Sequence, residues 1–559
     1  MKLLHFELIG SYKGLADQHY DFSAAPGNVI AFIGLNGSGK SQLMELIAET
    51  FSYLERHQRS DFTTRTPLTF CFRISYEWSS EGSDIERRER YTVELQKDQS
   101  IRISKSTLIP QPSNMVSTPT TQWLPESDCS LANLPLPRLI GYASGLNENL
   151  QRPFMRNAVQ YFDVMRTRSN RRARLAQPDV DEERLNKINL SYIRRFPGIF
   201  GTQPESDIDN SLRILEADTP IPNALFLDYD CANLVIAATG MLARAERDEL
   251  WPEIRLRHPS KAIIRYDLRQ APIEQDSIED IKQLIRTLGT ESINGLSIKT
   301  SNEQFDLYEL DYLHAEITID FLAPNTLNRL KEAYLEPSRF FWKLYKLQLL
   351  GVEQWAPSTR KLLRDDSFTG HVKKPLKGKL PLAVVDIELS DGTSFASIDD
   401  LSDGEAQLLH TIGAVRLFGD TESLFIFDEP ETHLNPSWRT RYHLDFKQAS
   451  PGLVTSQALI SSHSPFLISS LHREAVYHFE KIDGQSSMAS PSSETFGASF
   501  EVLIKKFFGL RSAISQTAVD EIRRQLDDNN LDNAHKRQWI EEQLGESMER
   551  AYLLKRLEG

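Results

Sequence analysis

Residues 28–41 read NVIAFIGLNGSGKS, an apolar run that leads into a glycine-rich loop. The run at 28–33 is almost continuously apolar, which is typical of a strand buried on both faces of a parallel sheet. Residues 34–41 fit the pattern G-x-x-x-x-G-K-[ST], in which backbone N–H groups and a helix N-terminus bind phosphate. This stretch predicts an α/β fold with a phosphate loop between a central strand and a helix.

The residue types in this loop fit separate roles. Glycines allow the tight turn that points backbone N–H groups at phosphate oxygens. Lys40 can reach the β- and γ-phosphates of ATP, and the Ser41 hydroxyl can ligate Mg²⁺. The predicted ATP-binding residues of the loop are Gly34, Asn36, Gly37, Ser38, Gly39, Lys40 and Ser41.

A second apolar strand, SLFIF at 423–427, ends in Asp428 and Glu429. Asp428 suits a contact to Mg²⁺, and Glu429 suits polarising the water that attacks the phosphate. A positioned base of this kind is worth a factor of about 10²–10⁴ in rate. An apolar strand that ends in two acids is common by itself, but the phosphate loop upstream favours the functional interpretation.

Two further motifs have both structural and functional interpretations. Ser402 and Glu405 have the spacing of a capping box at the start of a helix, and a capped helix N-terminus can also bind phosphate. His463 follows the apolar run at 457–460. It is either a partly exposed polar residue at a strand end or a hydrogen-bonding sensor of the γ-phosphate.

The motifs GLNGSGKS, LSDGE, FIFDEPETHLNP and SSHSP, in this order, resemble the ABC-type head ATPases. That group includes transporter domains and the heads of chromosome-maintenance and recombination-repair proteins. The resemblance implies an α/β fold with a P-loop sheet, an antiparallel β subdomain, a large mostly helical insertion and a helical C-terminal tail. It also implies that ATP and Mg²⁺ are bound and that ATP is sandwiched in a homodimer.

The same resemblance implies roles for individual residues. Asp428 would be the metal-side carboxylate, Glu429 the catalytic base and His463 the switch histidine. Ser402 and Gly404 would contact the γ-phosphate of ATP bound by the other subunit.

Four more positions are compared with the family, and one of them departs from its pattern. Lys13 stands where repair-type heads have a basic residue near the nucleotide. Asp403 replaces the second residue of the usual glycine pair. Gln151 is the candidate for the glutamine loop, and residues 434–436 stand where the family's dimer-contacting loop lies.

The spacing of the motifs distinguishes between branches of the group. About 360 residues separate Ser41 from Leu401, more than transporter domains have. Prolines interrupt any long coiled coil here, so we expect a compact, mostly helical insertion. The prolines stand at 177, 197, 204, 220, 222, 253, 259 and 272. The expected domains are an N-terminal ATPase lobe (1–150), the insertion (151–380), a C-terminal ATPase lobe (381–490) and a helical tail (491–559).

The whole chain is similar to the PtuA-type ATPases of Septu and retron-linked anti-phage systems, on residues 139–149, 429–434 and 494–499. This similarity implies a regulatory subunit that hydrolyses ATP slowly and controls a partner HNH nuclease of the PtuB-like kind. In retron versions it also implies a reverse transcriptase with its RNA–DNA product. We expect no nuclease site in this chain, because its 13 histidines form no HNH or metal-cluster spacing. The alternatives are a recombination-repair ATPase that binds DNA directly and a nucleotide-bound interaction scaffold.

Composition limits the partners of the 559-residue chain. A net charge of −14 argues against general nucleic-acid binding, so any such contact would need a local basic patch. One candidate patch is either a flexible, solvated loop or a contact for a phosphate backbone or an acidic partner, with possible nucleic-acid contact at 166–174. Its arginines are Arg152, Arg156, Arg166, Arg168, Arg171, Arg172 and Arg174. No apolar run is long enough for a membrane span, and three scattered cysteines form no disulfide framework, so we expect a cytoplasmic protein.

Periodicity predicts further elements. The N-terminus reads as an edge strand, and Asp228 and Asp230 read as surface acids. Residues 382–398 read as a hairpin around Asp391-Gly392. The other expected segments are strands at 68–76, 90–104, 139–142 and 317–321, a linker at 373–379 and a charged helical segment at 531–557.

Overall fold

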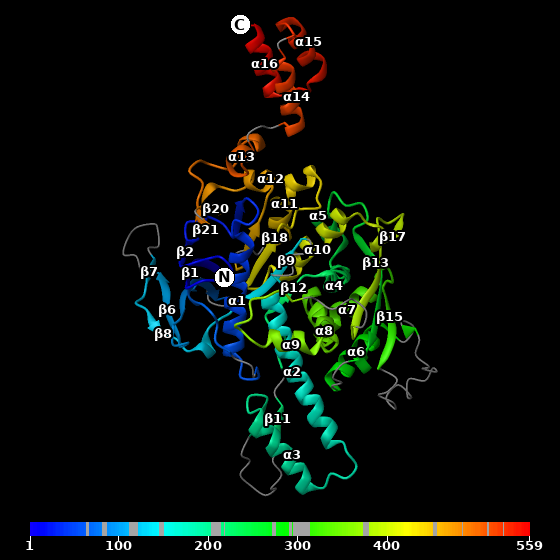
Figure 1. Ribbon diagram of the computed structural model, residues 1–559. Coiled ribbons are helices and arrows are strands. Elements are labelled where there is room, and N and C mark those ends of the chain that lie inside the picture. Colours follow the sequence, from blue (N-terminus) through cyan, green and yellow to red (C-terminus); the bar gives the residue numbers. More distant parts are fainter. Residues whose placement is uncertain are drawn as a thin grey trace, which may run out of the picture.

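A seven-stranded, mostly parallel sheet forms the centre of the computed structural model (Figure 1). All neighbours pair in parallel except β20 and β21. In spatial order the strands are β12 (Ala224–Phe226), β9 (Arg138–Ala143), β18 (Ser423–Asp428), β19 (Gln457–Ser461), β3 (Val29–Gly34), β20 (Val476–Ile482) and β21 (Gln485–Ala489). The structure describes residues 1–62, 66–80, 87–110, 121–144, 150–202, 214–216, 219–270, 275–289, 293–294, 313–372, 380–450, 455–482, 484–510, 514–528 and 530–558.

The central sheet is buried on both faces, as the apolar run at 28–33 predicts. Along β3, Ala31 and Ile33 belong to one hydrophobic core, whereas Ile30 and Phe32 belong to another. Helices α4 (Tyr229–Thr239) and α10 (Asp403–Phe418) contribute to the first core, and α1 (Lys40–Gln58) contributes to the second. The α/β fold class is therefore confirmed.

A predominantly antiparallel sheet packs beside α1 and forms the expected β subdomain. Its strands are β2 (Gln18–Asp21), β1 (Lys2–Ile9), β4 (Cys71–Ser80), β5 (Arg87–Leu95), β6 (Ile101–Pro110), β7 (Thr121–Trp123) and β8 (Ser127–Asp128). Two predictions are wrong here. The N-terminal strand is not an edge, because it pairs with both β2 and β4. Residues 90–104 are not one strand, because a turn at 96–100, with Gln99 at φ 65°, separates β5 from β6.

The segment expected as a compact, mostly helical insertion (151–380) contains helices α2 to α9, but it also shares two sheets with the rest of the chain. Strand β12 belongs to the central sheet, and a five-stranded antiparallel sheet crosses the expected boundary at 380. That sheet contains β14 (Ile293–Asn294), β15 (His314–Asp320), β13 (His258–Asp267), β16 (Leu382–Ser390) and β17 (Phe395–Ser397). The pair β16 and β17 confirms the hairpin at 382–398. The linker expected at 373–379 lies outside the described residues.

Helices α2 (Arg152–Leu175) and α3 (Glu182–Arg195) form an arm that projects from the body (Figure 1). A small sheet of β10 (Phe200–Thr202) and β11 (Ile214–Glu216) lies beside α3. The seven arginines lie on α2 and not in a loop, and they do not form one surface. Those at 152, 156, 168 and 171 are buried, and only Arg166 and Arg174 are exposed. Nucleic-acid contact at 166–174 stays a prediction.

The remaining helices cover the body and form the C-terminal tail. In the body are α5 (Arg244–Leu250), α6 (Gln275–Leu288), α7 (Thr326–Tyr334), α8 (Pro337–Leu349), α9 (Pro357–Leu363), α11 (Pro436–Ala449), α12 (Pro465–Ser469) and α13 (Phe500–Phe507). The tail bundle, which stands apart in Figure 1, has α14 (Gln516–Asp527), α15 (Asn533–Gln543) and α16 (Met548–Glu558). The segment at 531–557 is thus mostly two helices. No helix in the described ranges is long and apolar enough to cross a membrane.

His410 on α10 makes the stability of this core dependent on pH. Burial lowers the pKa of the ring to about 4, and its Nε2 has no hydrogen-bonding partner. Between pH values of about 4 and 6.5 the unfolded chain binds the extra proton and the folded chain does not, so stability falls as pH falls through this range.

We expect His410→Phe to remove this dependence. Lowering the pH from about 7 to about 5 should reduce the free energy of unfolding of the wild type by roughly 2 kcal/mol more than that of the variant. Urea denaturation at both pH values measures the difference. Equal losses in the two proteins would show that His410 is protonated in the fold.

Candidate functional site

Three parallel strands bring the predicted motifs to one edge of the central sheet. Strand β3 ends at Gly34, β18 ends at Asp428 and β19 ends at Ser461. The order β18-β19-β3 makes them neighbours, although nearly 400 residues separate Gly34 from Asp428. Because the carboxyl ends of parallel strands share one edge, the phosphate loop, the acidic pair and His463 lie together.

The phosphate loop depends on glycine at two positions. Gly34 has a φ of 137°, and a Cβ there would lie 2.2 Å from the Phe479 carbonyl oxygen. Gly39 has a φ of 114°, and a Cβ there would lie 2.3 Å from the Ser486 Oγ. Ser486 also donates to the Ser38 carbonyl. Strands β20 and β21 thus hold the loop against the start of α1.

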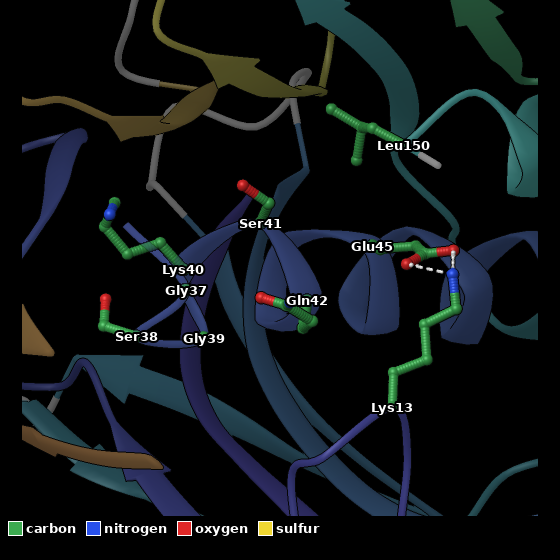
Figure 2. A pocket seen from close by; sticks show the side chains of 9 residues that line it. All are labelled: Lys13, Gly37, Ser38, Gly39, Lys40, Ser41, Gln42, Glu45 and Leu150. Carbon is green, nitrogen blue, oxygen red and sulfur yellow. Dashed lines mark hydrogen bonds and ion pairs between the residues drawn. The ribbon is translucent and has the colours of Figure 1, made fainter. Parts of the chain in front are cut away.

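A cavity of about 150 Å³ lies over this loop (Figure 2). The residues that line it are Lys13, Gly37, Ser38, Gly39, Lys40, Ser41, Gln42, Glu45 and Leu150. The Ser38 hydroxyl is buried, and no residue in the described part of the chain hydrogen-bonds to it. An unpaired hydroxyl, the N-terminus of α1 and two lysines suit a phosphate group.

Backbone carbonyls of the phosphate loop hold the Lys40 side chain over the loop. Its Nζ donates to the carbonyls of Gly34 (3.0 Å) and Leu35 (3.1 Å). Burial lowers the pKa of Lys40 to about 8, against the raising effect of Asp428 and Glu429. A bound phosphate would add a closer anion and stabilise the charged amine.

The acidic pair has a distinct conformation. Asp428 accepts a hydrogen bond from Ser461, whereas Glu429 has a φ of 51°. That left-handed backbone is rare for a side chain of this size. The Glu429 Oε1 lies 3.2 Å from the His463 Nε2, and this hydrogen bond lowers the pKa of Glu429. Glu429 is therefore ionised and able to accept a proton.

Mg²⁺ has two suitable oxygen ligands at this edge. Ser41 lines the phosphate cavity. Asp428 is the last residue of β18, and its carboxylate is close enough to Lys40 to raise the pKa of that amine. A hydroxyl and a carboxylate are oxygen ligands of the kind that Mg²⁺ takes beside phosphates. When bound, Mg²⁺ would neutralise phosphate charge as the bond to the leaving group breaks.

Glu431 is a site residue that sequence reasoning missed. It is buried and accepts a hydrogen bond from Ser462, and among the described residues its Oε2 has no partner. Burial raises its pKa to about 7, in contrast to Glu429 two residues earlier. Its available signal was the third acid of FIFDEPE, which one proline separates from the acidic pair.

A second and more open groove of about 800 Å³ adjoins the acidic pair. Asn36, Glu429 and His463 line it together with residues of α13 and of the segment that follows it. These residues are Ile504, Phe508 and Leu510. The His463 ring lies 6.1 Å from the Phe508 ring, centre to centre. Asn36 therefore faces the groove, whereas Gly37 to Ser41 line the phosphate cavity.

The signature residues lie elsewhere in the same chain. Ser402 and Glu405 form the capping box at the start of α10, so this structural interpretation is confirmed. A Cβ on Gly404 would lie 2.8 Å from the His433 carbonyl oxygen, which packs the signature against the turn after Glu429. Ser402 and Asp403 are exposed, and neither they nor Gly404 is among the described residues that line the cavity or the groove.

Lys13 lines the phosphate cavity, but its amine is already paired. Its Nζ lies 2.9 Å and 3.0 Å from the two Glu45 oxygens (Figure 2). Glu45 also contacts Arg152 at 2.6 Å, so its charge would stay paired if Lys13 moved to a phosphate.

Other candidate positions have structural explanations. Gln151 precedes α2 and lies beside Leu150 of the cavity. Asn435 caps α11 by accepting from the Trp438 backbone N–H at 2.9 Å. Asp228 caps α4, accepting from Asp230 and Cys231 N–H groups, so it is not merely a surface acid.

Residues 276–469 match the protein-family model described as "AAA domain, putative AbiEii toxin, Type IV TA system". The chain is also 25% identical over 189 residues to "Protein ea59" of Escherichia phage lambda. That match spans 30% of this chain and 35% of the phage protein. The family match supports an ATPase of AAA type, and the matched segment contains the signature, the acidic pair and His463.

Among solved structures, the SMC head domain of Thermotoga maritima is similar over 88% of this chain and 100% of that one. It is 10% identical, with a TM-score of 0.26. An SMC head bound to the C-terminal winged-helix domain of ScpA is similar over 88% of this chain and 98% of that one. It is 12% identical, with a TM-score of 0.28. Likeness at this level does not extend to function.

Proposed function

We propose that the protein binds ATP with Mg²⁺ at the edge formed by β3, β18 and β19 and hydrolyses it slowly. The observation that carries this proposal is the meeting of Lys40, Glu429 and His463 at that edge. Each of Lys40 and Glu429 lies close enough to perturb the pKa of the other. A cation for phosphate and an ionised base for water are thus in place together.

Each group of residues has a separate role in the proposed reaction. Backbone N–H groups of the loop and Lys40 bind the phosphates, and Ser41 and Asp428 hold Mg²⁺. Glu429 accepts the proton of the attacking water. His463 keeps Glu429 ionised and oriented through their 3.2 Å contact.

We propose that two copies of the chain complete each site. Ser402 is exposed at the start of α10, two residues before the buried Gly404, and a helix N-terminus attracts phosphate. The groove beside Glu429 is open and bears Leu35, which is 56% exposed. A partner's α10 N-terminus in this groove would close the site over the γ-phosphate.

Light scattering after size exclusion tests this arrangement on Glu429→Gln, which should retain ATP. We expect a dimer with ATP and Mg²⁺ and a monomer without nucleotide. Adding Ser402→Arg should abolish the dimer, because a bulky side chain would enter the phosphate contact. A species whose mass ignores both ATP and Ser402→Arg would leave the motif as a capping box only, and the interaction scaffold would then be preferred.

We propose that this ATPase is the regulatory subunit of an anti-phage complex whose HNH nuclease is a separate chain. The proposal rests on the resemblance at 429–434 and 494–499, and the matched family's description as a toxin–antitoxin component is compatible with it. A reverse transcriptase with its RNA–DNA product would be a further partner. Co-purification of an HNH protein supports this role, whereas DNA-stimulated turnover by the isolated chain favours the recombination-repair alternative.

A further inference from the structure

A cavity of about 1,110 Å³ lies away from the ATP site. It reaches Val29, the first residue of β3, whereas the phosphate loop follows Gly34 at the other end of that strand. It is therefore at the opposite edge of the central sheet. Helix α11, the β4–β5 pair and the segment at 469–475 contribute to its walls. None of its lining residues belongs to the site described above.

One face of α11 supplies polar groups to this cavity. Thr440, His443 and Lys447 recur at helical spacing, and Ser450 caps the same helix. Ser450 is 2% exposed, and its Oγ faces Gly419, because a Cβ on that glycine would lie 2.2 Å from it. Thr440 and Lys447 are the exposed polar side chains of this face.

The cavity wall is also rich in cationic groups. Lys447 is exposed on α11, and Lys2 and Arg88 line the same space. The one acidic residue of the lining, Glu77, is paired with Arg90 at 2.8 Å. The protein carries a net charge of −14, so a cavity with this surplus of cations selects an anion.

An exposed aromatic platform completes the lining. Phe496 is 55% exposed, and its ring is stacked on His472 at a centroid distance of 4.6 Å and an angle of 23°. Leu444, from α11, is 49% exposed beside the polar stripe. Aromatic rings beside lysines are the combination by which proteins bind unpaired nucleotides, since bases stack and phosphates pair with cations.

We infer that this cavity binds a nucleotide unit, with the base on Phe496 and the phosphate against Lys447. The unit is either a free nucleotide or part of a single strand of nucleic acid, since both offer the same base and phosphate. This binding does not depend on the ATP site, so Lys40→Ala should leave it unchanged.

Fluorescence anisotropy of a short fluorescein-labelled oligothymidine, titrated with the full chain, tests the inference. We expect Lys447→Gln and Phe496→Ala each to weaken binding by roughly tenfold, through loss of a charged contact and of a stacking surface. Lys481→Gln, at another exposed lysine, is the matched control and should bind as the wild type does. ATP hydrolysis should be the same in all three variants.

Competition with thymidine monophosphate distinguishes the two sources of the ligand. Displacement of the probe by the monophosphate assigns the cavity to free nucleotides, and displacement by unlabelled strand alone assigns it to nucleic acid. The inference is overturned if the wild type binds neither oligothymidine nor thymidine monophosphate. It is also overturned if Lys447→Gln and Phe496→Ala bind the labelled oligothymidine as tightly as Lys481→Gln does. Melting curves confirm that each variant is folded.

Discussion

Replacing Glu429 with Gln is expected to lower the rate of ATP hydrolysis by a factor of about 10²–10⁴ while ATP stays bound. The amide keeps the shape of the side chain and its contact with His463, but it cannot accept a proton from water. The phosphate contacts from Lys40 and the loop are untouched. Phosphate release measures turnover, and titration with a labelled ATP analogue measures affinity.

Glu431→Gln is the informative comparison, because Glu431 is close to Glu429 but buried and without a position in the groove. Burial raises the pKa of Glu431 to about 7, so a neutral side chain is tolerated there at neutral pH. We expect Glu431→Gln to retain most of the turnover that Glu429→Gln loses. If Glu429→Gln hydrolyses ATP at the wild-type rate, the base is another residue and the proposed reaction is wrong.

The sequence predicts this site well where function depends on local pattern. A run such as VIAFIG predicts a strand buried on both faces, and GSGKS predicts the phosphate loop. Each pattern depends only on residues that follow one another in the sequence. The meeting of Asp428 with the loop was also inferable, since carboxyl ends of parallel strands converge. What pattern alone does not provide is the strand order β18-β19-β3, which places His463 between the two.

Long-range pairing explains what the sequence did not predict. Residues 258–267 form β13 only because they pair on both sides, with β15 and with β16 more than 100 residues later. The arginines of α2 look like one basic surface because their partners lie far along the chain. Arg156 pairs with Glu49 on α1 and with Asp366, and charge counting within α2 cannot reveal either contact.

Glu49 is the centre of a buried ionic network that joins the phosphate cavity to the projecting arm. Its carboxylate contacts Arg156 at 3.1 Å, Arg56 at 3.2 Å and Arg152 at 3.7 Å. Burial opposes its ionisation, but the three arginines outweigh burial and lower the pKa of Glu49. All four side chains are 1–2% exposed, so water cannot replace any of these contacts.

We therefore expect Glu49→Gln to destabilise the fold by about 3–5 kcal/mol, because three buried guanidinium groups would lose their shared counter-charge. Urea denaturation measures the change as a lower midpoint. Glu183→Gln is the matched control. Glu183 pairs with Lys187 at 2.6 Å, but the Lys187 side chain is 72% exposed and that of Glu183 is 77% exposed. The urea midpoint should therefore not move. An unchanged midpoint would mean that the arginines are paired through Asp366 and backbone carbonyls alone, and that α2 is not coupled to the phosphate cavity through Glu49.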